Sequence, residues 1–350
     1  MLRYSRVTFA WVEAVSLRGT PMQLASFNYQ GRDRIGVRLN ADYLVDLAGA
    51  TGLEGPNAML QLISDGEGAL QQARDLVRSG MPPAGHELVP LIDIQWRPPV
   101  PKPGKILGVA LNNSASDARR ISGPSHPMFF MKPSTCLIGH LEDIEVRAYY
   151  GGLHPEPELG VIIGKRARDL DPNEAMDAVC GYTIVNDMTG NAMRAEDMVH
   201  YWALYARPDK PEETERREQH LSYAARYKGT DGFGPMGPWL TTRDEVPDPH
   251  ALDVTCSLGG VVLAEDSTQY LTYKVPEVLA FISRFHTLEP GDVVSMGTAF
   301  RPSATSTRSL HTGDLQRFDG PLEVSITGLG TLSNGVRRTE PKLPDWRLSR

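Results

Sequence analysis

Beyond residue 104 the chain is a series of short apolar runs, each bounded by glycine, proline or aspartate. Short runs with turn residues between them predict β-strands rather than helices. Helical patterns are fewer in this part, at Pro172–Cys180 and Val275–His286. Many short strands with few helices favour a β-rich sandwich or a barrel-like core. The predicted strands are Lys105–Ala110, Pro127–Met131, Glu158–Ile163, Gly181–Asn186, Val254–Leu258 and Val293–Met296.

A proline-rich segment at residues 97–103 separates this part from a smaller one at residues 22–100. Such a segment is stiff and extended, and it suits a domain boundary. The smaller part mixes apolar runs of strand length with amphipathic helical stretches, which predicts an α+β unit. Its predicted strands are Gln23–Tyr29, Arg34–Leu39, Tyr43–Asp46 and Leu88–Ile94, and its predicted helices are Asn57–Asp65 and Gly68–Ser79.

We therefore predict an α+β, β-rich fold with a small N-terminal α+β domain at residues 22–100 and a larger domain at residues 101–335. Residues 1–21 form an irregular N-terminal extension in this prediction, and residues 336–350 a C-terminal tail. The almost wholly polar stretch at residues 207–220 is predicted to be a solvated, charged insertion.

Composition and charge exclude several classes of protein. The net charge of −7 argues against a nucleic-acid partner, and no apolar run is long enough to span a membrane. No Gly-x-Gly-x-x-Gly motif follows a strand, so we set a Rossmann oxidoreductase aside. Glu13 interrupts the N-terminal apolar stretch and argues against a secretory signal, whereas a transit peptide stays open. Three scattered cysteines without a Cys-x-x-Cys spacing fit a reducing, cytoplasmic location.

The most informative local pattern is Glu156-Pro157-Glu158 at the start of an apolar run. Residues two apart in a strand share a face, so both carboxylates are expected to project together. The predicted strand Gly181–Asn186 ends beside another acid, Asp187. Adjacent carboxylates repel each other unless a cation lies between them. Carboxylates without cysteine or histidine ligands favour a hard ion, Mg²⁺ or else Mn²⁺ or Ca²⁺.

His154 lies two residues before Glu156 and shares its face if the strand extends that far. A fourth metal ligand, a base and an ordinary surface histidine are all open interpretations of this residue.

Six blocks of the chain, taken in order, resemble the fumarylacetoacetate hydrolase family. The blocks are LGVALN at 107–112, FFMKP at 129–133, EPELGVIIGK at 156–165, GYTIVNDMT at 181–189, KGTDGFGPMGPW at 228–239 and LEPGDVVSMGT at 288–298. The resemblance implies a mixed β-sandwich roll with a divalent metal ion at one mouth, usually in a homodimer. It also implies that Glu156, Glu158 and Asp187 are the metal ligands.

The same resemblance implies roles for other residues of these blocks. Lys228 matches a lysine beside the metal that holds substrate oxygens and the charge of the acidic cluster. Thr298, after Gly297, matches a position that contacts the substrate carboxylate. Lys132 matches a motif lysine near the site, so we include it among the substrate-binding candidates.

The segment that corresponds to the family's lid departs from the family pattern. In the family's hydrolases an NYxxHxxE motif supplies the histidine and glutamate that activate water. The stretch Asn112–Arg119 carries Ser116 in place of the histidine, Arg119 in place of the glutamate and Asn113 in place of the tyrosine. Serine has no useful basicity near neutral pH, so we predict that the usual water activation is missing.

Three explanations for this departure stay open. The first is a reaction without hydrolytic water, such as decarboxylation, dehydration or isomerisation. The second is hydrolysis with another base, for which His126 and Asp117 are the candidates. The third is a catalytically silent binding protein, against which the intact metal set argues. Arg119 and Arg120 are candidates for a second substrate carboxylate, the alternative being a solvated lid helix.

The sequence thus predicts a metal-dependent enzyme that acts on a small 2-oxo or 2,4-diketo acid. A divalent ion that chelates such an acid stabilises its enolate, which hydrolysis, decarboxylation and tautomerisation share. The family resemblance implies hydrolysis of a C–C bond. The missing lid pair favours a lyase or an isomerase.

Overall fold

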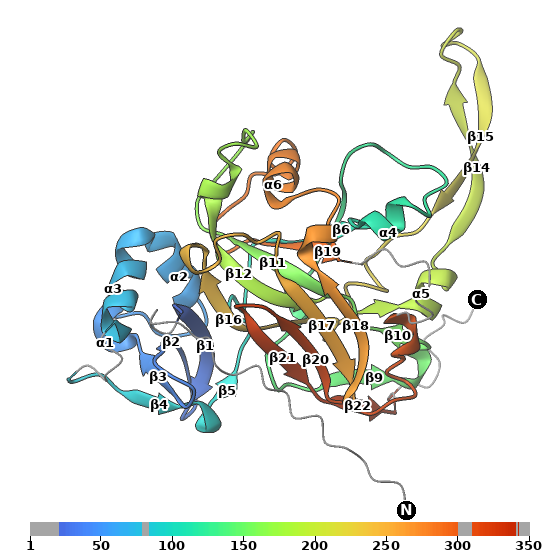
Figure 1. The fold of residues 1–350 in the computed structure, drawn as a ribbon. Coiled ribbons are helices and arrows are strands. Elements are labelled where there is room, and N and C mark those ends of the chain that lie inside the picture. Colours follow the sequence, from blue (N-terminus) through green and yellow to red (C-terminus); the bar gives the residue numbers. More distant parts are fainter. Residues whose placement is uncertain (1–20, 79–83, 300–309, 341, 343–350) are drawn as a thin grey trace, which may run out of the picture.

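The structure is a computed structural model and describes residues 21–78, 84–299, 310–340 and residue 342. The predicted N-terminal extension therefore lies outside the described residues apart from Pro21. The chain folds around one long mixed sheet, and a second sheet and several helices pack against its faces (Figure 1).

The long sheet joins the N-terminal part of the chain to the rest. Its strand order is β4-β3-β2-β1-β16-β12-β11-β19-β6-β7, with β5 paired to β1 and β8 paired to β16. The smaller N-terminal unit thus continues the main sheet through β1, which pairs antiparallel with β16. The strands are β1 (Gln23–Tyr29), β2 (Arg32–Arg38), β3 (Tyr43–Asp46), β4 (Leu88–Pro90), β5 (Gln95–Trp96), β6 (Ile106–Ala110), β7 (Met128–Lys132), β8 (Leu137–Ile138), β11 (Pro157–Ile163), β12 (Val179–Asn186), β16 (Gly234–Thr242) and β19 (Val293–Thr298).

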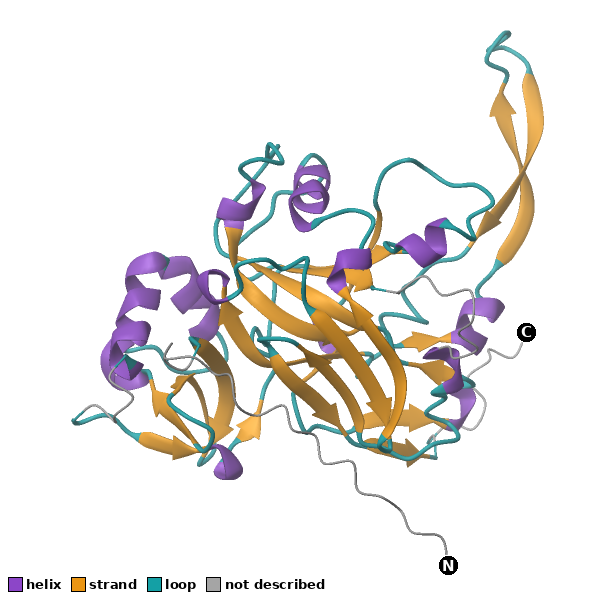
Figure 2. Cartoon of the chain, in the orientation of Figure 1, coloured by secondary structure: helices purple, strands orange, loops and turns teal. Residues whose placement is uncertain are grey.

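The second sheet, β18-β17-β20-β21, packs on the long sheet as the other layer of a sandwich (Figure 2). Its inward residues, among them Val254 and Val324, join Val161 and Tyr182 of the long sheet in one apolar core. This confirms the predicted β-rich fold. The strands are β17 (Asp253–Leu258), β18 (Val261–Ser267), β20 (Leu322–Ile326) and β21 (Gly330–Asn334).

Helices cover the N-terminal end of the long sheet. Met59 and Leu62 of α2 and Leu70 of α3 pack with Leu24 of β1 and Met236 of β16. The apolar residues of these helices recur at helical spacing, which explains why both were predictable. The helices of the chain are α1 (Ala48–Thr51), α2 (Ala58–Asp65), α3 (Glu67–Val77), α4 (Ser114–Asp117), α5 (Asn191–Glu196) and α6 (Val275–Ser283).

Three two-stranded pairs complete the described structure: β10 (Leu153–His154) with β13 (Thr189–Gly190), β9 (Ile144–Arg147) with β22 (Val336–Thr339), and β14 (Val199–Ala206) with β15 (Thr214–Leu221). The β14–β15 hairpin projects far from the sandwich (Figure 1), and it contains most of the predicted charged insertion. Strand β22 pairs with β9, so the segment predicted as a C-terminal tail begins as part of the fold.

Two predicted elements are wrong. Pro172–Cys180 is not an α-helix: only a 3₁₀ turn, η4 (Ala175–Ala178), forms, and Val179 and Cys180 begin β12. The predicted strand Leu88–Ile94 ends at Pro90, where the 3₁₀ turn η1 (Leu91–Asp93) begins. In both places pairing with the main sheet decides where the strand lies.

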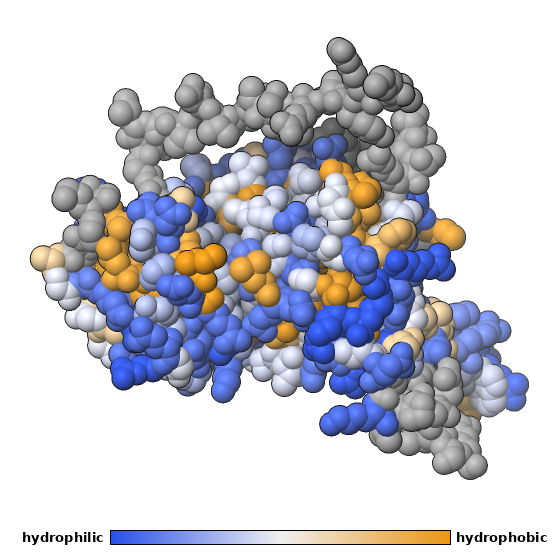
Figure 3. All heavy atoms as spheres, turned by 90° about the horizontal axis from the view of Figure 1, so that it is seen from below, coloured by the Kyte–Doolittle hydropathy of each residue, from blue (hydrophilic) through white to orange (hydrophobic). Residues whose placement is uncertain are grey.

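The surface carries mixed polar and apolar side chains. Seen from below, hydrophilic side chains cover most of the face, and hydrophobic ones form separate small patches between them (Figure 3). Among the described helices none has the length and apolar character that crossing a membrane requires.

Candidate active site

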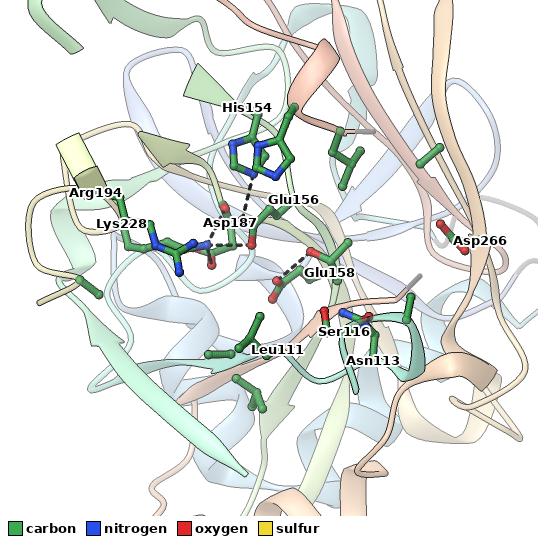
Figure 4. A pocket seen from close by; sticks show the side chains of 18 of the residues that line it. Leu111, Asn113, Ser116, His154, Glu156, Glu158, Asp187, Arg194, Lys228 and Asp266 are labelled. Atoms are coloured by element: carbon green, nitrogen blue, oxygen red, sulfur yellow. Dashed lines mark hydrogen bonds and ion pairs between the residues drawn. The ribbon is translucent and has the colours of Figure 1, made fainter. Parts of the chain in front are cut away.

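Two adjacent strands of the main sheet bring three carboxylates together. Glu156 directly precedes β11, Glu158 lies within it, and Asp187 directly follows β12. Strands β11 and β12 pair antiparallel with Pro157 opposite Asn186, and the Asp187 amide donates to the Glu156 carbonyl at 2.9 Å. The three side chains offer ligand atoms that all lie within 4.8 Å of one another. The predicted metal set is therefore brought together by strand register (Figure 4).

Two buried lysines hold Asp187. Lys132, at the end of β7, donates to one carboxylate oxygen of Asp187 and to the Phe233 carbonyl, the latter at 2.8 Å. Lys228 donates to the other oxygen of Asp187 at 2.5 Å and to Glu156 Oε2 at 2.8 Å. Burial alone would lower the pKa of Lys228, but Asp187 and Glu156 raise it overall, so this side chain stays charged.

Glu158 is held by neutral donors instead of a lysine. Its Oε2 accepts from Ser295 Oγ at 2.5 Å and from the Gly297 amide at 3.0 Å, and its Oε1 accepts from Thr298 Oγ1 at 3.3 Å. Burial, together with the charges of Asp187 and Glu156, raises the pKa of Glu158 to about 8. The raised pKa indicates that the two lysines do not fully offset the burial and the neighbouring carboxylates at this end of the cluster.

This donor set fits a divalent cation. Three carboxylates face two ammonium groups, and neither lysine makes a hydrogen bond to Glu158 among the described contacts. Each carboxylate oxygen has further lone pairs for an ion, and an all-oxygen set is the one that hard ions prefer. Glu156, Glu158 and Asp187 are the residues that would hold the ion.

A pair of histidines extends the cluster, and the sequence analysis did not assign it. His154 is buried, with 4% of its surface exposed, and its Nε2 lies 3.1 Å from Glu156 Oε1. Its ring centroid lies 4.1 Å from that of His311, and Asn191 Nδ2 lies 2.8 Å from Nδ1 of His154 and 3.2 Å from Nδ1 of His311. The spacing to Glu156 had already marked His154. No sequence signal connected it to Asn191 and His311, because these contacts join distant parts of the chain.

The lid segment begins directly after β6. Leu111 adopts φ of 54°, which turns the chain out of the sheet, and Asn112 Nδ2 donates to the Met296 carbonyl at 2.8 Å. Asn113 caps α4 by accepting from the Ser116 amide at 2.7 Å. Asn113 thus has a structural role at the position where the family motif carries a tyrosine.

The three carboxylates, Lys228, the two histidines and the lid segment line one cavity of about 840 Å³. Figure 4 shows Lys228 and Arg194 on one side of the carboxylates and Asn113 and Ser116 on another. Arg119 and Thr298, two of the predicted substrate-binding residues, also line the cavity.

The other predicted residues lie elsewhere. Lys132 and Gly297 contact Asp187 and Glu158 and are not among the lining residues, so they position the carboxylates. His126 does not line the cavity either, and its ring stacks on Phe281 with centroids 5.0 Å apart. The structure does not bring this candidate base to the cluster.

Two further lid residues are engaged with each other. Asp117 accepts from Thr272 Oγ1 at 2.5 Å and forms an ion pair with Arg120, whose Nη2 lies 3.2 Å from Asp117 Oδ1. Neither residue lines the cavity, which separates Arg120 from its neighbour Arg119.

Known proteins with similar sequences include the mitochondrial oxaloacetate tautomerases of Homo sapiens and Rattus norvegicus. Each is 27% identical over 244 residues, which are 69% of this chain and 69% of the relative.

Among solved structures, the chain resembles maleylpyruvate hydrolase from Sphingobium sp. SYK-6 in complex with manganese(II) ion and pyruvate. The TM-score is 0.66 and the identity 27%, over 91% of this chain and 99% of that one. A fumarylacetoacetate hydrolase from psychrophilic Exiguobacterium antarcticum gives a TM-score of 0.66 at 25% identity, over 91% of this chain and 100% of that one.

Residues 105–337, two thirds of the chain, match the family described as fumarylacetoacetate (FAA) hydrolase, C-terminal. This match covers the second sheet, the strands of the long sheet from β6 onward, the three carboxylates and the lid segment. The chain belongs to the fumarylacetoacetate hydrolase family of enzymes.

Proposed function

We propose that this enzyme acts on a small 2-oxo acid with a divalent metal ion held by Glu156, Glu158 and Asp187. The observation that carries the proposal is the convergence of these carboxylates at a cavity, with Lys228 beside them. A divalent ion at this set supplies a Lewis acid that polarises the 2-oxo group and stabilises negative charge on it.

The residues around the set have complementary tasks in this proposal. Ser295 and the Gly297 amide keep Glu158 in place. Lys132, which does not line the cavity, keeps Asp187 in place by donating to its carboxylate. Lys228 lines the cavity with its positive charge beside the carboxylates, and this charge attracts the oxygens of a bound acid. Thr298 lines the cavity and donates its hydroxyl to Glu158, which places it beside the proposed position of the substrate carboxylate.

The lid favours a reaction that does not need hydrolytic water. Ser116 and Arg119 line the cavity at the positions of the missing pair, and neither is a base near neutral pH. The similarity to proteins named oxaloacetate tautomerase supports a keto–enol conversion or a related enolate reaction, such as decarboxylation.

Hydrolysis of a C–C bond in a 2-oxo or 2,4-diketo acid is the second candidate. The similarity to a maleylpyruvate hydrolase structure that contains manganese and pyruvate favours it. Hydrolysis requires a base other than the lid pair. His154 and His311 are the histidines among the described residues that line the cavity, and they are the candidates for this base.

We also propose an identity for the metal ion, an oligomeric state and a location in the cell. The ion is proposed to be Mg²⁺, with Mn²⁺ or Ca²⁺ as the alternatives. A homodimer and a cytoplasmic location also remain proposals. The three cysteines are buried and free, as expected in a reducing compartment.

The test is turnover followed by NMR with added Mg²⁺, using oxaloacetate, an acylpyruvate and a 2-keto-3-deoxy sugar acid. Accelerated enol–keto exchange, or release of CO₂ or water, is expected in the wild type and not in Glu158→Ala. Splitting of the acylpyruvate into two acids would support the second candidate instead. Binding of metal and 2-oxo acid with no turnover of any compound would contradict the enzyme proposal for this panel.

A further inference from the structure

The lining of the cavity includes positive charge that the metal cluster does not use. Arg119, at the end of the lid, and Arg194, in α5, both line the cavity with exposed side chains. Within the described residues neither arginine forms an ion pair, whereas the neighbouring Arg120 is paired with Asp117 at 3.2 Å. An unpaired guanidinium at a cavity wall is a ready partner for a carboxylate, which it binds in a bidentate manner.

His311 lies between this wall and the metal cluster. Its ring packs on His154, with centroids 4.1 Å apart, and His154 contacts Glu156 through Nε2 at 3.1 Å. His154 therefore lies between His311 and the proposed metal ligand Glu156. It also lines the cavity itself.

Asn191 orients both imidazoles. Its amide nitrogen lies 2.8 Å from Nδ1 of His154 and 3.2 Å from Nδ1 of His311, so it donates to both. With Nδ1 accepting, the proton of the neutral imidazole is on Nε2. For His154 this proton points at Glu156 Oε1, and the contact with Asn191 gives His311 the same tautomer.

Arg119, Arg194 and His311 line the same cavity, and the charges around His311 affect its pKa. Burial lowers the pKa of His311 most, and His154 adds to this effect. The charges of Arg194 and Arg119 lower it further, against an opposing effect of Glu156. The pKa of His311 is therefore below the ordinary value of an imidazole.

Acidic residues of β18 line another part of the cavity. Glu265 and Asp266 of β18 line the cavity, and Figure 4 shows Asp266 on the opposite side of the carboxylates from Lys228 and Arg194. A second negative group on the substrate would be attracted to the arginines rather than to the exposed carboxylate of Glu265.

We propose that Arg119, Arg194 and His311 bind the second carboxylate of a 2-oxo dicarboxylic acid, whose 2-oxo carboxylate end is held at the metal set. This assignment rests on the proposed function and narrows its substrate class to dianions. It also gives a role to Arg119, which replaces an acidic residue of the family's lid motif. A guanidinium that recognises a carboxylate contributes binding energy where a glutamate would oppose the substrate.

The test is calorimetric binding to the full-length protein with saturating Mn²⁺. The ligands are pyruvate and acetopyruvate, which carry one carboxylate, and oxaloacetate and 2-oxoglutarate, which carry two. In Arg119→Gln and in Arg194→Gln the affinity for the dicarboxylates is expected to fall about 10-fold or more, since a hydrogen bond to a charged group contributes about 1.5–3 kcal/mol. The affinity for the monocarboxylates is expected to stay within about twofold.

Two further variants sharpen the test. Arg120→Gln is the matched control, because this arginine is paired with Asp117 and does not line the cavity, and it is expected to leave all four affinities unchanged. His311→Gln keeps an N–H donor and is expected to retain more dicarboxylate affinity than His311→Phe. Circular dichroism melting of each variant confirms that it is folded.

Equal losses for mono- and dicarboxylates, or no loss for dicarboxylates, in Arg119→Gln and Arg194→Gln would overturn the assignment. If the wild type binds no 2-oxo acid in a Mn²⁺-dependent way, the proposed function fails. Dicarboxylate binding that still requires both arginines would then support this subsite on its own.

Discussion

The two sides of the cavity are built on different kinds of structure. The carboxylate side rests on β11, β12 and β19 in the middle of the long sheet, where Glu158 and Asp187 are each 2% exposed. The arginine side rests on short helices, with Arg119 just beyond α4 and Arg194 in α5, and both side chains are exposed. The metal set is thus fixed by the core of the fold. The groups proposed to recognise the rest of the substrate lie on segments that change at little cost to stability.

The largest expected effect is a loss of stability when Lys132, the buried partner of Asp187, is replaced. Lys132→Met leaves Asp187 with one buried charge partner fewer, and loss of one partner of a buried ion pair costs about 3 kcal/mol or more. Urea unfolding of the metal-free protein measures this loss. Lys165→Met is the control, since Lys165 is exposed, and it is expected to change the unfolding free energy by less than about 0.5 kcal/mol. Equal unfolding free energies of the two variants would contradict the claim that the buried carboxylate side is part of the structural framework.

The next effect concerns the metal itself. Glu158→Gln keeps the shape of the side chain but removes its charge, and we expect Mn²⁺ affinity to fall by at least about 100-fold, since residues that merely orient a ligand already contribute about 10–100-fold. Electron paramagnetic resonance titration of free Mn²⁺ gives the dissociation constant. Glu265→Gln removes an exposed acid of the same cavity and is expected to alter the affinity by no more than about twofold. A similar loss in both variants would mean that the cavity attracts the ion only by its overall charge.

A smaller effect is expected from the residue that orients Glu156. His154→Phe keeps a buried ring but removes the contact to Glu156 Oε1, and Mn²⁺ affinity is expected to fall about 10-fold. The same titration measures it, with the exposed His200→Phe as control. An unchanged affinity would show that Thr189, which donates to the same oxygen at 2.7 Å, is sufficient to hold Glu156.

The smallest effect is expected on the other side of the cavity. Arg194→Gln removes an exposed side chain without an ion pair in the described structure, so the unfolding free energy is expected to change by less than about 0.5 kcal/mol. Thermal unfolding of wild type and variant side by side measures the change. A loss as large as that of Lys132→Met would show that this wall is also part of the structural framework.

Strands with a regular apolar pattern could be predicted from the sequence, whereas polar strands could not. The strands β1 and β3 were predicted with the bounds that the structure has, because their apolar runs end at turn residues. The common face of Glu156 and Glu158 followed from the strand period. By comparison, β15 was not predicted, because its residues, Thr-Glu-Arg-Arg-Glu-Gln-His-Leu, have no apolar face that marks a strand.

The long-range part of the site could not be predicted. Asn191 lies 120 positions before His311, and their contact depends on how β13 and the turn η7 (Leu310–Thr312) pack beside β10. Local pattern gives no register between such distant segments. The same limit applies to His126: it is close in sequence to the lid, but its ring packs on Phe281 of α6 and not at the cavity.

The most direct test of the account is an anomalous-scattering map from crystals of the wild-type protein soaked in Mn²⁺. The account predicts one strong peak in the cavity within about 2.0–2.6 Å of oxygens from Glu156, Glu158 and Asp187, the range for hard-ion ligands. Crystals of Glu158→Gln treated in the same way should lack the peak. A saturating soak that leaves this position empty in the wild type, or places the ion on other residues, would contradict the central claim.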